Sequence, residues 1–283
     1  MKCDLHTHTN FSDGSYSPSS LVAEAKRLGL IIALTDHNTT SGLPEFIAEA
    51  EREEVTAIGG TELSTVFDGN EFHLIGLFIS PEYYSRVDSL CTEYMILKEI
   101  SNIELCEKLN ERGYKIDYAA VKARNMKGNA NRAHVAAELV KGGYVSSTKE
   151  AFEKLLDEKI GLYVPPKRLE LIDGIKFLKE IGALPILAHP LKDASPEQLR
   201  EMLPILIDAG LVAIETMHSS YSDDDIAIVK QIALDFGILE SGGSDFHGLV
   251  KPDVSLGVGK GNLDIGEDVY NRLLSLKRNG GNI

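Results

Sequence analysis

The chain lacks the features that mark secreted and membrane proteins. Its first residues, MKCDLHTHTN, contain no apolar core of a signal peptide, and its longest apolar runs, such as LGLIIAL, are far shorter than a membrane span. It also lacks internal repeats, low-complexity tracts and long linkers. We therefore expect a cytoplasmic globular protein of 283 residues that makes no contact with a membrane.

Cysteine and positive charge are both scarce. Cys3, Cys91 and Cys106 form no C-x-x-C pair and cannot all be bridged to one another, which favours a reducing compartment. The 29 lysine and arginine residues are outnumbered by 43 aspartate and glutamate residues, which gives a formal net charge of -14. This charge disfavours a broad surface for long nucleic acids. It does not exclude a small anionic substrate, because a metal cluster reverses the sign of the charge locally.

The sequence does contain short apolar strands that alternate with amphipathic helices. A first helix is bounded by Ser17 as N-cap, Pro18 at its first position and Gly29 at its end. The seven expected strands are CDLHTHT, LIIALT, VTAIGGTELS, EFHLIGLFI, ALPILAHP, LVAIETMH and GILESGGSDFH. Strands joined largely by helices predict an α/β fold with a parallel sheet or a closed barrel.

The strand pattern stops between Pro81 and about Ile160. The segment RVDSLCTEYMILKEISNIELCEKLNERG has apolar residues at helical spacing up to Gly113, and further helices are expected over residues 132–141 and 147–158. The segment YVPPKRLE is the expected hinge back into the strands. We predict a helical insertion subdomain over residues 81–160, beside one end of a barrel made of residues 1–80 and 161–283.

Polar residues follow the ends of the expected strands. His6 and His8 are two residues apart, so on a strand their side chains project from one face. The residues within or at the end of a strand are His6, His8, Asp36, His37, Glu62, His73, His189, Asp245 and His247. Each alone has an ordinary structural explanation, such as a helix cap or a packed histidine. Six of the eight histidines in the chain belong to this set, however, and in a β/α barrel the strand ends converge on one opening. Together they predict a metal site.

These residues fall into a series of motifs that resembles a known family. The segments DLHTHTNFSDG, LTDHNTT, IGGTELS, FHLIG, LAHP and GGSDFHG are similar to the successive motifs of the polymerase and histidinol phosphatase (PHP) metallohydrolases. The resemblance implies a distorted seven-stranded β/α barrel related to the TIM barrel. The NRAHVA segment and the helical insertion resemble free-standing family members that act on small nucleotides, notably nucleoside 3′,5′-bisphosphates.

The resemblance also implies two or three divalent metal ions and a set of ligands. The implied ligands are His6, His8, Glu62 and Asp245 for a first ion, Glu62, His73 and His189 for a second, and Asp13, His37 and His247 for a third. Imidazole and carboxylate ligands suit Mn, Fe or Zn without choosing among them. Asp36 is expected to orient a neighbouring group instead of binding an ion.

The expected reaction is attack on phosphorus by a hydroxide that bridges two metal ions. Its substrate would be a phosphate monoester of a small nucleotide, here the 3′-phosphate of a nucleoside 3′,5′-bisphosphate. The residues expected to serve catalysis are Glu62, His189, Asp245 and His218. The resemblance implies that Arg132 and His134 contact substrate phosphate; without it, an ordinary helix surface would be the preferred explanation for both. Asn131, Lys167 and Arg168 are further candidates for substrate contact, and the alternative for Lys167 and Arg168 is a solvated loop.

Two positions depart from the family pattern. Asn38 stands where an aspartate is more usual, which removes one negative charge beside the expected site. Asn131 stands where a glycine often precedes the arginine, which puts the start of that helix and the identity of the substrate in question.

Other functions are consistent with the same set of expected metal ligands. A 5′-3′ exonuclease on short RNA oligonucleotides and a phosphatase of the histidinol-phosphate type would use the same ions. A metal-stabilised binding module without turnover is the alternative that is not an enzyme; the complete ligand set argues against it. The sequence defines neither the physiological substrate nor the oligomeric state.

Overall fold

The structure, a computed structural model, describes residues 1–124 and 130–281. Internal contacts divide the chain into two compact units, Met1–Asp88 with Leu169–Ile283, and Ser89–Arg168. We call them the barrel unit and the helical unit. Whether residues 1–80 with 161–283 and residues 81–160 are independent domains stays a prediction.

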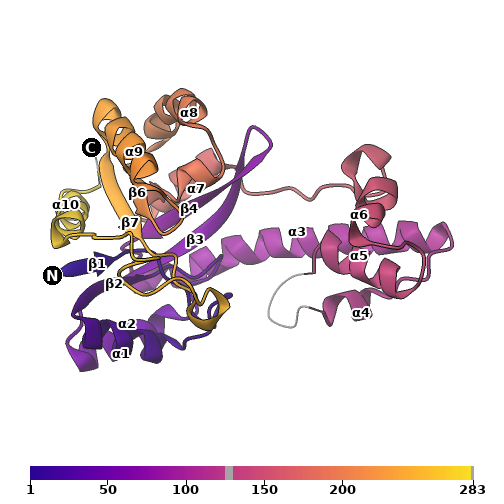
Figure 1. Ribbon diagram of the computed structural model, residues 1–283, viewed down its shortest axis with the longest axis horizontal. Coiled ribbons are helices and arrows are strands. Elements are labelled where there is room, and N and C mark those ends of the chain that lie inside the picture. Colours follow the sequence, from indigo (N-terminus) through magenta and orange to yellow (C-terminus); the bar gives the residue numbers. More distant parts are fainter. Residues whose placement is uncertain (125–129, 282–283) are drawn as a thin grey trace. The chain divides into compact units, whose positions relative to one another are not determined.

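A sheet runs through the barrel unit (Figure 1). Among the described residues its strands, which are neighbours in chain order, are β1 (Lys2–Asp4), β2 (Leu30–Leu34), β3 (Ala57–Phe67), β4 (Asn70–Leu77), β5 (Leu184–Leu187), β6 (Ala213–His218) and β7 (Leu239–Gly243). The pairs β3–β4 and β4–β5 are antiparallel and the others parallel. The antiparallel hairpin turns at Asp68 and Gly69, whose φ angles of 48° and 77° suit a tight hairpin turn.

The sheet curves until its first and last strands meet. The Leu5 N–H donates to the Gly242 carbonyl at 3.1 Å, and the Asp245 N–H donates to the His6 carbonyl at 3.0 Å. A nearly closed barrel of seven strands results, with one hairpin that breaks the regular β/α order. This confirms the predicted distorted barrel.

Alternate residues of the strands face two apolar cores. In β2, Ile31 and Ala33 pack into the barrel interior, while Ile32 and Leu34 pack against helices α1 (Pro18–Leu28) and α2 (Leu43–Glu53). This burial on both faces explains why LIIAL is uniformly apolar. The remaining helices of the barrel unit are α7 (Leu171–Glu180), α8 (Pro196–Ala209), α9 (Asp223–Phe236) and α10 (Glu267–Arg278).

Helix ends follow the sequence signals. The Ser17 hydroxyl accepts from the Ser20 N–H, Pro18 is the first residue of α1, and Gly29 ends the helix in a left-handed conformation.

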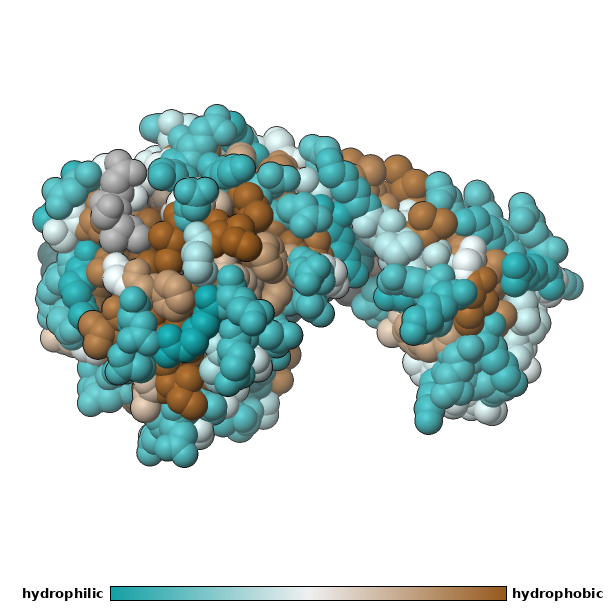
Figure 2. Space-filling model, turned by 90° about the horizontal axis from the view of Figure 1, so that it is seen from above, coloured by the Kyte–Doolittle hydropathy of each residue, from teal (hydrophilic) through white to brown (hydrophobic). Residues whose placement is uncertain are grey.

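In the described part of the chain, none of the helices has the length and apolar character needed to cross a membrane. On the face displayed in Figure 2, hydrophilic side chains cover most of the surface and leave scattered apolar patches.

The helical unit has its own core. Its helices are α3 (Tyr84–Glu111), which begins in the barrel unit, α4 (Tyr118–Lys122), α5 (Arg132–Lys141) and α6 (Thr148–Ala151), followed by single turns at Phe152–Leu156 and Glu158–Ile160. Leu105, Leu109, Val135 and Leu139 are buried together. The prediction of a helix over residues 147–158 is wrong in one respect. The chain becomes extended at Asp157, whose carboxylate accepts from the Lys159 N–H and starts a new turn.

Closure of the barrel depends on the absence of a side chain at position 243. A Cβ at Gly243 would overlap the backbone nitrogen and the Cβ of His6 on the neighbouring strand. We predict that Gly243→Ala lowers the free energy of unfolding by about 1–3 kcal/mol, the usual cost of overpacking. Urea unfolding measures this. Ser275→Ala, on the exposed face of α10, is the control and should change it by less than about 0.5 kcal/mol. Equal midpoints for the two variants would contradict the proposed closure.

Candidate functional site

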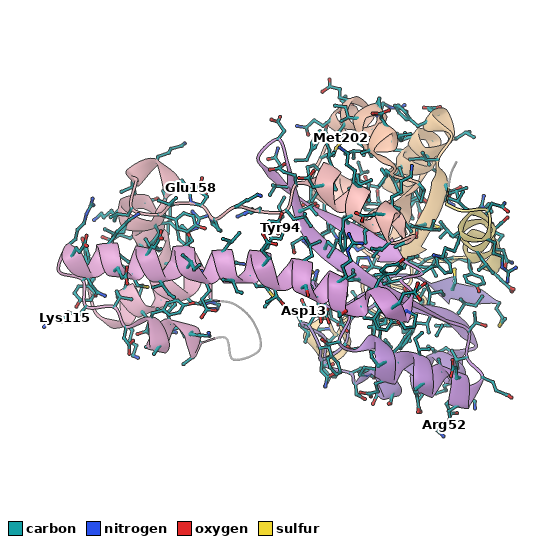
Figure 3. All side chains as sticks on the ribbon, turned by 180° about the vertical axis from the view of Figure 1, so that it is seen from behind. Asp13, Arg52, Tyr94, Lys115, Glu158 and Met202 are labelled. Atoms are coloured by element: carbon teal, nitrogen blue, oxygen red, sulfur yellow. The ribbon has the colours of Figure 1, made fainter. Side chains whose placement is uncertain are left out.

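The nine residues predicted as metal ligands all belong to the barrel unit, and the structure brings them together. His6 and His8 follow β1, His37 follows β2, and His189 follows β5. Asp245 and His247 follow β7, while Glu62 and His73 lie within the antiparallel hairpin of β3 and β4. Asp13 comes from the loop between β1 and α1 (Figure 3). Sites far apart in the sequence thus converge because neighbouring strands end at one opening.

Glu62 is the centre of the cluster, and its two carboxylate oxygens face different sets of imidazoles. Its Oε1 lies 2.8 Å from His73 Nδ1 and 3.1 Å from His189 Nε2. Its Oε2 faces three nitrogens, His6 Nε2 at 3.1 Å, His8 Nε2 at 3.2 Å and His37 Nδ1 at 3.1 Å. The side chain is buried, so a single carboxylate links two groups of potential ligands.

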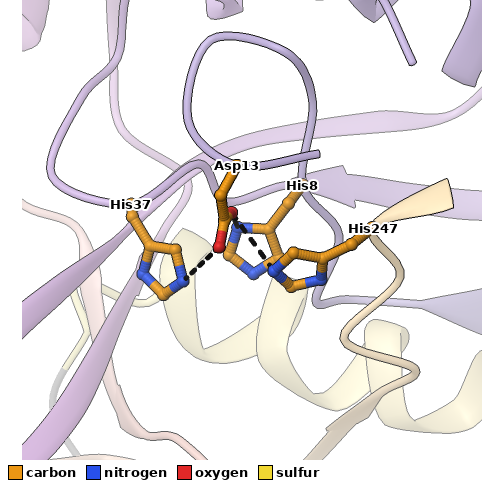
Figure 4. Close-up of side chains that lie close together, drawn as sticks. All are labelled: His8, Asp13, His37 and His247. Carbon is orange, nitrogen blue, oxygen red and sulfur yellow. Dashed lines mark ion pairs between the residues drawn. The ribbon is translucent and has the colours of Figure 1, made fainter. Parts of the chain in front are cut away.

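A second carboxylate, Asp13, gathers three imidazoles of its own. Its Oδ1 lies 3.2 Å from His247 Nε2 and 3.9 Å from His8 Nδ1, and its Oδ2 lies 3.8 Å from His37 Nε2. Figure 4 shows the Asp13 side chain directed toward these three rings. One ligand atom from each of the four residues lies within 4.8 Å of the others, so that they could hold one ion.

Asp36 holds the loop that carries Asp13. Its Oδ1 accepts from the Thr9 N–H at 2.7 Å and from the Ser12 hydroxyl at 2.5 Å, and its Oδ2 accepts from the Thr9 hydroxyl at 2.5 Å. Buried and fully occupied in this way, Asp36 orients a neighbouring segment, as the sequence predicted for it.

Two imidazoles are fixed by hydrogen bonds on the side away from the cluster. His6 Nδ1 donates to Glu215 Oε1 at 3.0 Å, and His247 Nδ1 donates to the Asp245 carbonyl at 2.8 Å. In the neutral ring, each bond leaves Nε2 without a hydrogen and directed inward, which is the arrangement of histidine ligands in metal sites.

Glu215 is a functional residue that the sequence reasoning missed. It is fully buried in β6, where its second oxygen, Oε2, accepts from the His189 N–H at 2.8 Å. The available signal was a glutamate inside the apolar strand LVAIETMH, because an acidic residue in a buried strand needs a partner.

Three residues beside the cluster have left-handed backbone conformations without being glycine. The φ angles are 53° at Asn38, 27° at His189 and 57° at Asp245. Such conformations cost on the order of 1–3 kcal/mol and persist where the surroundings enforce them, typically at functional sites. Asn38 is fixed by two hydrogen bonds: its amide nitrogen donates to the Ser64 hydroxyl at 3.0 Å and its amide oxygen accepts from the Ser64 N–H at 2.9 Å. The effect of the missing negative charge on the site stays a prediction.

Burial and charge act in opposite directions on the titrating groups. Burial favours protonated Glu62, but its contacts with the surrounding imidazoles hold the pKa of its carboxyl well below the usual range. Burial also disfavours charged His73, yet hydrogen bonds to Glu62 and Glu71 raise its pKa to about 10. Burial dominates at His37, whose pKa falls to about 3. The cluster therefore keeps its carboxylates negative, and His73 has to lose a proton before its ring nitrogen can bind a cation.

The residues present fit a metal ion. In the described chain, His8 Nδ1, Glu62 Oε2, His189 Nδ1 and His218 Nε2 are buried without a hydrogen-bond partner. His6 Nε2 and His8 Nε2 face each other at 3.0 Å. Two nitrogens bound to one ion at about 2.1 Å, with an angle of about 90–110° between them, lie about 3.0–3.4 Å apart. Shared ligation thus accounts for two ring nitrogens that converge on one point and for buried polar atoms without a hydrogen-bond partner.

His218 joins this cluster from the end of β6. Its Nδ1 accepts from the Ser220 N–H at 3.1 Å, so that the ring hydrogen is on Nε2, which lies 3.5 Å from Asp245 Oδ2. Burial lowers the pKa of His218, which keeps the ring neutral.

The residues predicted to contact substrate all belong to the helical unit; they are Asn131, Arg132, His134, Lys167 and Arg168. Asn131 is the N-cap of α5: its side chain accepts from the His134 N–H, and His134 Nδ1 accepts from the Asn131 N–H. An asparagine in place of glycine therefore strengthens this helix start. The Arg132 guanidinium lies 4.2 Å from the centre of the Tyr163 ring and donates to the Leu156 carbonyl at 3.3 Å.

Comparison with known proteins identifies the family. The PHP domain model matches residues 4–164, and the chain belongs to this family. A 5′-3′ exoribonuclease of Haemophilus influenzae is 30% identical over 248 residues, which cover 87% of this chain and 90% of that protein. A 3′,5′-nucleoside bisphosphate phosphatase of Chromobacterium violaceum is 30% identical over 86% of each chain. A phosphoribosyl 1,2-cyclic phosphate 1,2-diphosphodiesterase of Eggerthella lenta is 29% identical over 87% of this chain and 94% of its own.

Solved structures agree with this family. A Bifidobacterium adolescentis protein described as a metal-dependent phosphoesterase superimposes with a TM-score of 0.69 at 26% identity and covers 96% of this chain and 95% of its own. The predicted family, barrel fold and class of enzyme, a hydrolase acting on phosphoester bonds, are confirmed.

The position of Glu62 between two sets of imidazoles generates a prediction. Glu62→Gln keeps the size of the side chain but removes its charge, and should lower the content of bound metal and reduce turnover by orders of magnitude while the barrel stays folded. Elemental analysis of the purified protein measures the metal content, phosphate release measures the turnover, and circular dichroism measures the fold. Glu240→Gln, at a half-buried glutamate of β7 outside the cluster, is the matched control. Unchanged metal content and rate in Glu62→Gln would show that Glu62 binds no ion.

Proposed function

We propose that the barrel unit binds two or three divalent metal ions and hydrolyses a phosphate monoester of a small nucleotide, namely the 3′-phosphate of a nucleoside 3′,5′-bisphosphate. The observation that carries this proposal is the division of the Glu62 carboxylate, with one oxygen facing His73 and His189 and the other facing His6, His8 and His37. A carboxylate shared in this way suits adjacent ions.

The proposed ligands follow the contacts. They are His6, His8, Asp245 and Glu62 Oε2 for one ion, Glu62 Oε1, His73 and His189 for another, and Asp13, His37 and His247 for a third. Bound Mn, Fe or Zn would lower the pKa of water and neutralise charge on the phosphate. Glu62, His189 and Asp245 would thus serve catalysis by holding the ions.

The other residues position these ligands or contact the substrate. Glu215 keeps the Nε2 of His6 free of hydrogen, and Asp36 holds the Asp13 loop. His218 carries its hydrogen on Nε2 and is neutral, which suits it to donate a hydrogen bond to a phosphate oxygen. We therefore assign it this contact instead of the role of an acid.

A second candidate function is 5′-3′ cleavage of short RNA. The exoribonuclease of Haemophilus influenzae and the bisphosphate phosphatase of Chromobacterium violaceum are equally similar to this chain, at 30% identity. The chemistry of the two substrates is related, because a nucleoside 3′,5′-bisphosphate resembles the 5′ end of an RNA strand. The net charge of -14 favours the smaller of the two substrates.

The test is a substrate panel with metal retained during purification. Initial rates should be measured for nucleoside 3′,5′-bisphosphates, nucleoside 5′-monophosphates, histidinol phosphate and short oligoribonucleotides. We expect the highest catalytic efficiency on the bisphosphates. A higher efficiency on 5′-phosphorylated oligonucleotides would establish the second candidate, and no turnover on any ester would leave a binding module.

Arg132 tests the choice of substrate. If its guanidinium holds the phosphate that does not react, Arg132→Ala should lower the catalytic efficiency on a bisphosphate by about ten- to a hundredfold. The effect on p-nitrophenyl phosphate, which has one phosphate, should be much smaller. Arg124→Ala, at another partly buried arginine of the helical unit, is the control.

The alternative role of Arg132 is structural, because its guanidinium packs over the Tyr163 ring and is 3.5 Å from the Glu158 carboxylate. Equal losses on both substrates, together with a lower unfolding temperature, would assign Arg132 to the fold and remove this support for a bisphosphate substrate.

A further inference from the structure

Asp245 separates the imidazole cluster from a group of basic side chains. Its Oδ1 faces the imidazoles, 3.3 Å from His8 Nε2. Its Oδ2 faces three other groups, Lys251 Nζ at 2.7 Å, His218 Nε2 at 3.5 Å and Lys192 Nζ at 4.0 Å. One oxygen of this carboxylate is therefore available to an ion, while the other is surrounded by hydrogen-bond donors.

The two lysines are placed here by the same loops that carry the proposed ligands. Lys192 ends the short turn Pro190–Lys192, directly after His189. Lys251 follows the turn Gly248–Val250, directly after His247. Both side chains are partly exposed, with 41% and 37% of their surface accessible, so their ammonium groups can reach a ligand at the opening.

The third donor is buried and has no partner. His218 is 1% exposed, and within the described chain its Nε2 makes no hydrogen bond. Because Nδ1 accepts from the Ser220 N–H, Nε2 carries a hydrogen that is directed toward the same carboxylate oxygen as the lysines. A buried donor without an acceptor indicates a ligand that supplies one.

We infer that Lys192, His218 and Lys251 form a phosphate-binding subsite that holds the reacting phosphoryl group of the substrate. The inference rests on the proposed function. Divalent ions beside Asp245 would repel both ammonium groups, and an anion shared between the ions and the lysines removes that repulsion. A phosphate oxygen offers the acceptor that His218 Nε2 lacks and a negative charge for the two ammonium groups, whereas the base or sugar of a nucleotide carries no negative charge.

The subsite predicts a division of roles between the two units. Lys192 and Lys251 contact the phosphate that reacts, so the removal of either charge should weaken the binding of every phosphate ester to a similar extent. Arg132, by contrast, is proposed for a phosphate that only bisphosphates carry. The two sets of basic residues are therefore distinguished by the pattern of losses across substrates.

The test is binding of inorganic phosphate to the metal-loaded protein, measured by isothermal titration calorimetry. Lys251→Met and Lys192→Met keep an unbranched apolar stem and remove the charge. We expect the dissociation constant for phosphate to rise by about ten- to a hundredfold in Lys251→Met and by a similar or smaller factor in Lys192→Met. Lys260→Met is the matched control, because Lys260 pairs with Asp253 at 2.8 Å outside the cluster, and it should leave phosphate binding unchanged.

Metal content is measured on each variant by elemental analysis, and titrations are compared at equal content. Lys251→Arg retains the charge and should restore most of the phosphate affinity. Unchanged phosphate affinity in both methionine variants would overturn the inference. A lower metal content with unchanged phosphate affinity at equal metal content would also overturn it, because Lys251 would then only neutralise the charge of Asp245. Phosphate binding does not require turnover, so a chain that binds phosphate through these lysines but hydrolyses no ester would refute the proposed function and leave the subsite standing.

Discussion

Burial of the Glu62 carboxylate is the constraint on which the rest of the site depends. A lone carboxylate without water costs several kcal/mol even after its surroundings relax, so it must be surrounded by groups of opposite charge or by ions. Five imidazoles supply this environment, and they come from three strand ends and one hairpin strand. The barrel is the scaffold that brings them to one carboxylate, because no single helix or hairpin offers so many directions of approach.

Holding these imidazoles requires the two ends of the barrel to stay joined. Asp4, the first residue of the DLHTHT motif, is buried and accepts from the Ser244 N–H at 2.8 Å, the Ser244 hydroxyl at 2.6 Å and the Gly257 N–H at 2.8 Å. It ties β1 to the segment after β7, two residues from His6 and next to Asp245. The aspartate that opens the motif therefore acts through position: it fixes the distance between ligands that come from opposite ends of the chain.

The parts of this site that follow from local pattern were accessible from the sequence, and the parts that follow from packing were not. His6 and His8 were recognised because strand periodicity places both on one face, and Asp245 because it ends a strand. Glu215 contacts His6, which is 209 positions away, through an arrangement that only the closed barrel creates, and Lys251 returns to Asp245 because of the fold of the loop after β7. The two hydrogen bonds between Asn38 and Ser64 likewise depend on how β2 and β3 lie side by side. The break at Asp157 was missed because one capping aspartate outweighs helical periodicity.

The same geometry connects the net charge of the chain to the size of the proposed substrate. The chain carries a formal charge of -14, yet Lys192 and Lys251 lie against the cluster and bound ions would add positive charge there. Attraction is then confined to a region of about one Debye length, roughly 8–10 Å at physiological salt, which spans one nucleotide. Each further phosphate of a long strand would meet the field of a chain with a net negative charge and gain little affinity. A positive centre within an acidic protein thus favours a mononucleotide or the end of a short oligonucleotide, and the steepness of this preference should decrease as salt screens the surface.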